Sequence, residues 1–501
     1  MALKLFNLPK ITYQCLLPTV PRLYFPLNSL SSLTQNPSVS ADDPHVATIF
    51  NIITSSPSLD SMVKSLNSSQ IPLSKDLIEQ VLKLVSFRRA NPIKTLEFFD
   101  YIHKKRGFIH TQYSYDAMLD ILGRSRRFEE IWRVLKEMHH KDPDFITPRT
   151  VAIVLKRIAK GGSVRQIVES FKKLKKLCIN FDVLCFNALL RTLCQEKSMS
   201  DARNVYHSLK HDFRPNANTF NILLSGWKSI EEAELLFQEM RDFEIKPNLV
   251  SYNCLIDVYC KNHQLDKARK VFEEMREQEI NPDVRSYTSL IGGFGSIGEP
   301  DEARAVLKEM REFGCNPDVA AYNAAIRNFC IAKRLRDAFG LMDEISQVGL
   351  MPNVTTFNLF FRCFYYVNDM RNASSLYKKM RDVHSCLPNT QSCEFLIRLC
   401  RKHGDLGFGL ELWEDMVLNC FGSLTLVSDV LIDWLCDEGR LDEAEKCLFQ
   451  LLEKGQQPSN ASIKRIRVLM ELAQRHESLH KLHEAMSTYE HGRVENNGLS
   501  F

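Results

Sequence analysis

The chain has 501 residues, with 65 Lys and Arg against 61 Asp and Glu, and its formal net charge of +4 neither requires nor excludes a nucleic-acid partner. Its length alone would correspond to about three average globular domains. No run of about 18 consecutive apolar residues occurs, so the sequence predicts no insertion into a membrane.

The first 41 residues contain no acidic residue, and Asp42 is the first one in the chain. This segment carries Lys4, Lys10 and Arg22 and is rich in serine towards its end. Such a composition is typical of an organelle transit peptide, and an ordinary disordered tail is the alternative. We expect residues 1–41 to direct the protein to the mitochondrion, with the chloroplast as the alternative, and residues 42–75 to form an N-terminal helical cap or linker.

From Val183 to Asn389 the sequence repeats about every 35 residues, and the segment that begins at Leu249 returns at Val284 and Val319. The fourth residue of each unit is aromatic: Phe186, Phe220, Tyr252, Tyr287, Tyr322 and Phe357. Each unit closes on a proline: Pro215, Pro247, Pro282, Pro317, Pro352 and Pro388. A fixed period of this length indicates an array of supersecondary units, none of which buries its apolar face alone.

Each unit reads as two helices. Apolar residues from Tyr252 to Cys260 recur at helical spacing, a polar break follows, and a second apolar stripe runs from Leu265 to Met275. The closing proline cannot continue the second helix and so separates one unit from the next. The predicted fold is therefore all-α, a right-handed α-solenoid, or superhelix, of stacked helix-turn-helix repeats.

The units resemble the pentatricopeptide repeat, and the chain is similar to the P-class, plant organellar members of that family. The resemblance rests on the Tyr/Phe-Asn start, a Cys late in the first helix (as at Cys260), Leu-Asp-Glu-Ala from Leu441 to Ala444, and a final Pro-Asp or Pro-Asn. The early Trp and the Leu-Gly pair of tetratricopeptide repeats do not occur in register. We expect degenerate units in residues 76–182, six well-formed units in 183–389, two degenerate units in 390–459, and a C-terminal helical cap and tail in 460–501.

Two positions of the unit do not look like packing positions. The fifth residues are Asn187, Asn221, Asn253, Thr288, Asn323 and Asn358, and the residues after the closing prolines are Asn216, Asn248, Asp283, Asp318, Asn353 and Asn389. Asn is a poor helix former, so its recurrence inside a helix favours a role in ligand contact, where an amide offers both a donor and an acceptor. Asp or Asn just before a helix is also a good N-cap, so capping remains an alternative role for the second set.

The resemblance implies that these two positions together select one RNA base per unit. By the family's pairing rule, Asn with Asn favours a pyrimidine, Asn with Asp favours U, and Thr with Asp favours G, which gives the core YYUGYY from 5′ to 3′. The second residue of each unit, such as Leu184, Val250 or Arg285, resembles the family position that lies between successive bases. In the outer units the fifth residues become Asp116, Ala152, Glu394 and Asp429. Acids there would repel phosphate, so we expect these units to extend or cap the array.

No catalytic domain is expected. Some family members carry a zinc deaminase, which needs His-x-Glu and Cys-x-x-Cys, but the nearest cysteines here, Cys254 and Cys260, are six positions apart. The cysteines are expected to be buried free thiols. The histidines of residues 475–483 have helical spacing but no cysteine or acidic ligand set beside them, so they favour a solvated face, and neither metal nor cofactor is expected.

The sequence therefore predicts a monomeric, sequence-specific, single-stranded RNA-binding protein that is not an enzyme. It would act in organelle RNA metabolism, through transcript stabilisation, processing, splicing or translation, with other RNA-processing factors as further partners. The alternative is a protein–protein interaction scaffold of the tetratricopeptide type. A face with Asn, Thr and basic residues would favour RNA, whereas a hydrophobic groove would favour a peptide.

Overall fold

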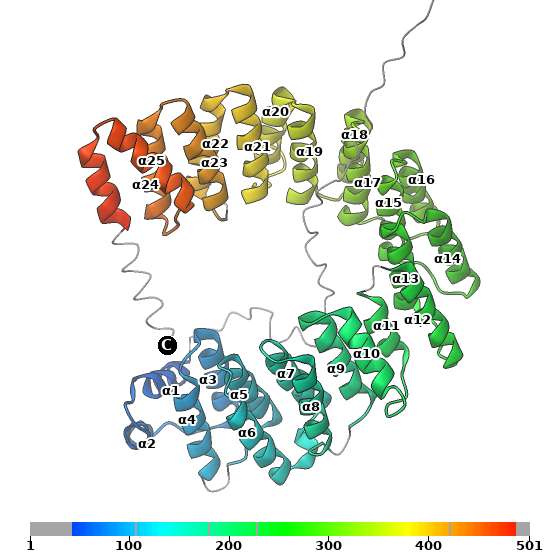
Figure 1. Cartoon of the computed structure of the whole chain (residues 1–501), viewed down its shortest axis with the longest axis vertical. Helices are drawn as coiled ribbons and strands as arrows, with labels where there is room; N and C mark the ends of the chain where they lie inside the picture. The colour runs from blue at the N-terminus through cyan, green and yellow to red at the C-terminus, as the bar shows by residue number, and fades with distance from the viewer. Residues whose placement is uncertain (1–42, 106–107, 179–180, 227–228, 420–421, 487–501) are drawn as a thin grey trace, which may run out of the picture. The chain divides into compact units, whose positions relative to one another are not determined.

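The computed structural model describes residues 43–105, 108–178, 181–226, 229–419 and 422–486, and the regular secondary structure within them is helical throughout (Figure 1). They fall into two compact units, one ending at Met118 and the other beginning at Leu119. Residues 1–41, where the sequence predicts a transit peptide, lie outside the described residues. No described helix is both long and apolar enough to span a lipid bilayer.

The first compact unit is a cluster of short helices. They are α1 (Pro44–Ser55), α2 (Leu59–Ser68), α3 (Lys75–Arg88), α4 (Pro92–Lys104) and the start of α5 (Gln112–Arg124). Helix α1 packs against α2, α3 and α4. Phe98, Phe99 and Ile102 of α4 are fully buried. These side chains provide the apolar core of this part of the chain.

The second compact unit contains regularly alternating helices. After α6 (Phe128–Lys141) and the 3₁₀ turn η2 (Pro143–Phe145), the first helices of the successive pairs are α7 (Pro148–Ala159), α9 (Val183–Glu196), α11 (Ala217–Leu224), α13 (Leu249–Lys261), α15 (Val284–Ser296), α17 (Val319–Ile331), α19 (Val354–Val367), α21 (Thr390–His403), α23 (Thr425–Asp437) and α25 (Asn460–Leu472). The second helices are α8 (Val164–Lys175), α10 (Met199–Leu209), α12 (Ile230–Asp242), α14 (Leu265–Glu277), α16 (Pro300–Glu312), α18 (Leu335–Gln347), α20 (Met370–Asp382), α22 (Leu406–Asn419) and α24 (Leu441–Glu453). Residues 476–486 are also helical.

The helix pairs stack in sequence order. Each first helix from α7 to α23 packs against its own second helix and against the next first helix, so the first helices form one continuous layer that ends with α25. Figure 1 shows these pairs following one another along the second unit. The prediction of an all-α solenoid built from helical hairpins is confirmed.

The recurring apolar positions form the core between the helices. The aromatic Tyr252 of α13 packs edge-on against Phe237 of α12, and Ala268 and Met275 of α14 are fully buried. Cysteines line this core too: none of the described cysteines forms a disulfide, and burial raises the pKa of the Cys260 thiol to about 12. Such thiols are protonated at neutral pH and pack as small apolar groups.

A row of ion pairs, which we call the second-helix ladder, joins consecutive second helices. Its rungs are Lys210–Glu239, Arg241–Glu274, Arg276–Glu309, Arg311–Glu344 and Arg381–Asp415. Between α18 and α20 the corresponding positions hold Ser346 and Lys379, which cannot form an ion pair with each other. Because the groups are half-exposed, each rung contributes only about 0.2–1 kcal/mol, but it favours one register between neighbours.

Candidate nucleic-acid interface

The residue after each closing proline caps the first helix of the next unit. The side chain of Asp283, for example, accepts the backbone N–H of Ser286 at 2.9 Å at the start of α15. The other caps are Asn216, Asn248, Asp318, Asn353 and Asn389. Capping is therefore one role of all six residues, and each also has backbone dihedrals in the extended region, as an N-cap requires.

The fifth residue of a unit reaches across to the cap of the next unit. The side chain of Asn253 in α13 is only 2% exposed, and its Nδ2 donates to Asp283 Oδ1 at 3.0 Å. Its Oδ1 accepts the hydroxyl of Ser286 at 2.5 Å. We call the fifth residue and the following cap a junction pair, and the hydroxyl that joins them a junction hydroxyl.

The same network recurs at four further junctions. The junction pairs are Asn187–Asn216, Asn221–Asn248, Asn323–Asn353 and Asn358–Asn389, with Nδ2–Oδ1 distances of 3.3, 3.2, 3.3 and 3.2 Å. Their junction hydroxyls belong to Thr219, Ser251, Thr356 and Ser392, at 2.8, 2.7, 2.7 and 2.6 Å from the fifth-residue Oδ1. The fifth-residue amides thus have a structural role that the sequence did not reveal.

The junction between α15 and α17 is different. Thr288 Oγ1 donates to Val284 O of its own helix at 2.6 Å instead of crossing to the next unit. The cap Asp318 accepts the backbone N–H of Ala321 at 2.8 Å, and Ala321 offers no hydroxyl. Asp318 itself is exposed.

Each network leaves a defined polar group on the surface. The Oδ1 atom of a capping Asn accepts helix N–H groups, which leaves its Nδ2 as a donor. Of these caps, Asn248, Asn353 and Asn389 are exposed and Asn216 is half-buried. In Asp283 the Oδ2 atom takes that place and can only accept when ionised. The second residues beside these groups are also accessible: Leu184 is 50% exposed and Val250 41% exposed. The twelve predicted base-reading residues thus line the N-terminal ends of the stacked first helices.

The acidic fifth residues of the outer units are engaged within the protein. Asp116 is buried, Glu394 forms an ion pair with Arg398 at 2.8 Å, and Asp429 accepts the backbone N–H of Ser459 at 2.8 Å. These carboxylates are therefore not free to face a ligand in the way the sequence suggested. Their junctions are held by arrangements other than the amide network.

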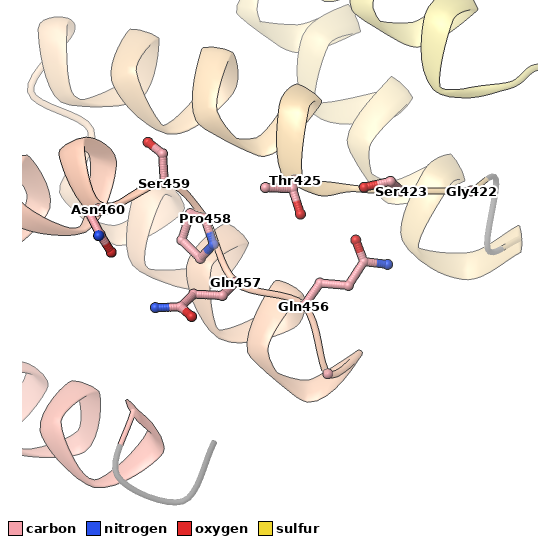
Figure 2. Close-up of a pocket in the computed structure, with 9 residues that line it drawn as sticks. Gly422, Ser423, Thr425, Gln456, Gln457, Pro458, Ser459 and Asn460 are labelled. Carbon is pink, nitrogen blue, oxygen red and sulfur yellow. The ribbon is translucent and has the colours of Figure 1, made fainter. Parts of the chain in front are cut away.

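A polar pocket of about 580 Å³ lies at the junction between the last two first helices, α23 and α25. Figure 2 shows Gln456, on the loop after α24, directed towards the segment that carries Ser423 and Thr425. The Gln456 Oε1 atom accepts the N–H of Leu424 at 2.7 Å. None of the described residues that line this pocket is ionisable, and they offer hydrogen bonds without charge.

A set of arginines was missed by the sequence-based reasoning. The ninth residue of the first helix is arginine in four units: Arg191, Arg327, Arg362 and Arg398. Among the described residues, the first three have no acidic partner, and Arg327 and Arg362 are exposed on the first-helix layer. Their recurrence at one register was the sequence signal that could have revealed them.

A smaller hollow of about 330 Å³ on this layer is basic and aromatic. It is lined by Tyr365, Arg398, Arg401, Lys402 and Val430. The ammonium group of Lys402 lies 3.6 Å from the centre of the Tyr365 ring and donates to Tyr365 O at 3.1 Å. Arg398 and Arg401 form ion pairs with Glu394 and Asp437, so Lys402 provides the positive charge of this hollow. A cation next to an aromatic ring suits an anionic, planar ligand such as a nucleotide.

The histidines near the C-terminus do not gather into a metal site. His476, His480 and His483 are all exposed, and no group of three or more His, Cys, Asp or Glu side chains among the described residues is arranged to bind a metal ion.

Three family models match the sequence. The model of the PPR repeat family matches residues 247–296, 286–330 and 317–366, that of the pentatricopeptide repeat domain matches 170–228, and that of the PPR repeat matches 113–142 and 429–456. These segments include most of the junctions described above.

Similar proteins occur in Arabidopsis thaliana. One pentatricopeptide repeat-containing protein is 63% identical over 452 residues, which cover 90% of this chain and 92% of the relative. A second is 34% identical over 248 residues, which cover 48% of this chain and 49% of the relative. A third, whose name describes it as mitochondrial, is 32% identical over 41% of this chain and 40% of its own length.

Solved structures of similar fold include two RNA complexes. The maize protein PPR10, in complex with an 18-nucleotide psaJ RNA element, is 20% identical with a TM-score of 0.45, and the match covers 93% of this chain and 77% of that chain. Yeast Rmd9p, in complex with a 16-nucleotide target RNA, is 14% identical with a TM-score of 0.38, and the match covers 89% of each chain.

Proposed function

Because this chain belongs to the pentatricopeptide repeat family, as the relative that is 63% identical over 90% of its length shows, we propose that it binds single-stranded RNA and reads one base per unit. The observation that carries this proposal is the row of junction pairs, each of which holds one outward polar group in a fixed orientation. Bases of a single strand present hydrogen-bonding edges that such groups can distinguish.

The junction pairs with two asparagines present donors. The Nδ2 of the cap can donate, and so can the second Nδ2 hydrogen of the fifth residue, except at Asn358, whose Nδ2 also donates to Gln391 Oε1 at 3.2 Å. Pyrimidines offer acceptors at O2, and C adds N3 whereas U adds O4. Donor groups therefore suit either pyrimidine at Asn187–Asn216, Asn221–Asn248, Asn323–Asn353 and Asn358–Asn389.

The two junctions capped by aspartate present an acceptor. Asp283 Oδ2 suits the N3–H of U, while the remaining Asn253 hydrogen suits a flanking carbonyl of the same base. At Thr288–Asp318 the carboxylate accepts the backbone N–H of Ala321 and no other donor among the described residues, so it can accept both N1–H and N2–H of G. Together the six pairs support the core YYUGYY, read in the order of the units.

The phosphate backbone requires positive charge beside the reading groups. Arg327 and Arg362 lie on the same first-helix layer without acidic partners among the described residues, and the hollow around Lys402 adds charge at one end. Such groups bind phosphate without sequence preference and fix the strand along the array. A protein scaffold would need a hydrophobic groove for a peptide, whereas these residues provide positive charge.

The protein would act in an organelle as a P-class member of the family, because its units keep a nearly constant length and several relatives are named mitochondrial. We place it in the mitochondrion, with the chloroplast as the alternative, and take residues 1–41 as the transit peptide. Residues 183–389 would read RNA and the outer units, 76–182 and 390–459, would extend the array. Occupancy of one segment would then stabilise a transcript or guide its processing, splicing or translation, alone or with other RNA-processing factors.

Filter binding of an RNA with the core YYUGYY, single-stranded and annealed to its complement, tests this function across a salt series. We expect tight binding to the single strand and weak binding to the duplex, because pairing hides the base edges. Affinity should fall by about 0.7 log units per decade of salt for each phosphate contacted. Equal binding to both forms, or a flat salt response, would instead support the protein-binding scaffold.

A further inference from the structure

We propose that the junction hydroxyls are positioning residues for base selection: each orients the amide of the preceding fifth residue and so decides which groups of the junction pair face the RNA. This inference rests on the proposed function and concerns the same site. The residues are Thr219, Ser251, Ser286, Thr356 and Ser392, the third residues of their first helices.

These hydroxyls cannot act by touching RNA. All five side chains have zero relative exposure. The Ser286 hydroxyl lies 2.5 Å from Asn253 Oδ1 and accepts the backbone N–H of Asp283 at 3.1 Å. Any effect of Ser286 on base preference must therefore pass through Asn253 and Asp283.

The Ser286 hydroxyl has two acceptors within hydrogen-bond distance, Asn253 Oδ1 at 2.5 Å and Asp283 Oδ1 at 2.9 Å. The backbone N–H of Asp283 occupies a lone pair of the Ser286 oxygen, so the single hydroxyl hydrogen is free to donate, and its shortest contact is Asn253 Oδ1. That bond requires the oxygen of the Asn253 amide on the inner side, which leaves Nδ2 to donate to Asp283 Oδ1 at 3.0 Å. Asp283 Oδ2 is then the atom left for a base.

Without the hydroxyl, Asn253 Oδ1 loses its inner donor, and only the acceptor Asp283 Oδ1 still favours the present orientation of the amide. An amide flipped by 180° would place Nδ2 where it meets no acceptor and Oδ1 against Asp283 Oδ1, so the aspartate would turn away from its present position. The outward pattern of one donor beside one acceptor, which selects U over C, would then be lost. The fifth residue and the cap provide the donor and acceptor groups that a base can contact, and the junction hydroxyl orients the amide of the fifth residue.

The chain contains a natural comparison. At the junction after α15 the fifth residue is Thr288, whose hydroxyl bonds Val284 O, and the third residue of α17 is Ala321. At the junction before α9 the fifth residue is Ala152, and the third residue is Cys185. At these two junctions, where the fifth residue has no amide to orient, the hydroxyl is absent too. The outer junctions with acidic fifth residues do not follow this rule, because Thr150 and Ser462 follow Asp116 and Asp429.

Loss of the hydroxyl is tested in the full chain with Ser286→Ala and the conservative Ser286→Thr, using RNAs that differ only in U or C at the third base of the core. Ser286→Ala should reduce the U-over-C preference at that base by about tenfold, on the scale of one oriented base contact. It should leave the other five preferences and the salt slope unchanged, and Ser286→Thr should behave as the wild type. A uniform loss of affinity for every RNA, or an unchanged U-over-C ratio in folded Ser286→Ala, would overturn the inference.

A second experiment adds a junction hydroxyl at the junction that lacks one, and so it does not depend on a destabilised variant. Thr288→Asn alone should change the G preference at the fourth base only weakly, whereas Thr288→Asn with Ala321→Ser should favour U at that base by about tenfold. Ala321→Ser alone is the control and should keep G. Equal recoding by the single and double variants would contradict the role of the hydroxyl. A wild type without any base preference would instead contradict the proposed function.

Discussion

The carboxylate of Asp283 caps helix α15 and, at 3.0 Å, accepts the side-chain amide of Asn253 from the preceding unit. One residue thus starts its own helix and holds the neighbouring helix in register. Because the cap is exposed on one side and bonded on the other, it can combine a structural role with ligand contact.

The replacement Asp283→Asn should change base preference without unfolding the protein. Asn caps helices about as well as Asp, so stability should change by less than about 0.5 kcal/mol. The outward acceptor becomes a donor, and the preference for U over C at the third base should fall by about tenfold. Asn248→Asp is the matched reverse change and should create a U preference at the second base. Filter binding with U/C pairs measures both, and unchanged ratios in both variants would contradict the assignment.

Two glycines of α15 should respond in opposite ways to alanine. A Cβ at Gly295 would lie 1.7 Å from Asn328 Oδ1, and Asn328 is buried and donates to Ile291 O at 2.7 Å. Gly295→Ala must therefore displace that amide and should lower the free energy of unfolding by about 1–3 kcal/mol. A Cβ at Gly292 meets nothing within 4 Å, so Gly292→Ala should raise it by about 0.5–1 kcal/mol. Thermal unfolding followed by circular dichroism should separate the two, and equal melting temperatures would count against this packing.

The gap in the second-helix ladder should be repairable. Ser346→Arg together with Lys379→Glu places a cation and an acid at the two vacant positions between α18 and α20. We expect the double variant to be about 0.2–1 kcal/mol more stable than the wild type at low salt, and to lose this gain at high salt. Ser346→Arg alone would face Lys379 and should be slightly destabilising. Thermal midpoints at two salt concentrations test this, and a double variant no more stable than the single one would refute it.

Acid should destabilise the first compact unit through His110. Its side chain is 1% exposed and stacks on Phe99 with ring centroids 3.6 Å apart, and burial lowers its pKa to about 4. The folded state therefore keeps the ring neutral where the unfolded chain, with a pKa near 6.5, binds a proton. The free energy of unfolding is therefore highest above pH 6.5, and it should fall by about 3 kcal/mol as the pH is lowered from 6.5 towards 4.

Hydrogen exchange of α4 amides between pH 7 and pH 4 measures this effect, after correction for the intrinsic pH dependence of exchange. His110→Gln cannot take up a proton, so its stability should vary less over the same range. A variant with the same pH dependence as the wild type would show that other groups, such as the carboxylates, are responsible.

The helices could be predicted from the sequence because their signals are local. Tyr252 and Ile256 lie on one apolar stripe, and Pro282 marks the end of the unit, so the chain carries its own boundaries. Capping by Asp283 could also be anticipated, since Asp before a helix is a common N-cap. These inferences need no knowledge of the neighbouring unit.

The partners of Asn253 could not be predicted in the same way. Its bonds reach Asp283 and Ser286, 30 and 33 positions along the chain, and they depend on how one first helix lies against the next. A periodic sequence reveals which positions recur but not which recurring positions meet. The sequence shows that Thr288 occurs together with Ala321, but only the hydrogen bonds of the other junctions show that these two positions contact each other.

The second-helix ladder also bears on how such a chain can change length. Arg276 bonds Glu309 of the following unit, and Glu274 of the same helix bonds Arg241 of the preceding one. A duplicated or deleted copy of this unit would therefore bring its own cation and acid to the new borders, and no charge would be left without a partner. Rearrangement of the units that contain α12, α14 or α16 should be tolerated on this ground, because each of these helices carries both an acid and a cation. Duplication of the unit that contains α20 would instead place Lys379 of the second copy next to Arg381 of the first copy. The ladder thus favours growth and loss of whole repeats in the middle of the array over its later part.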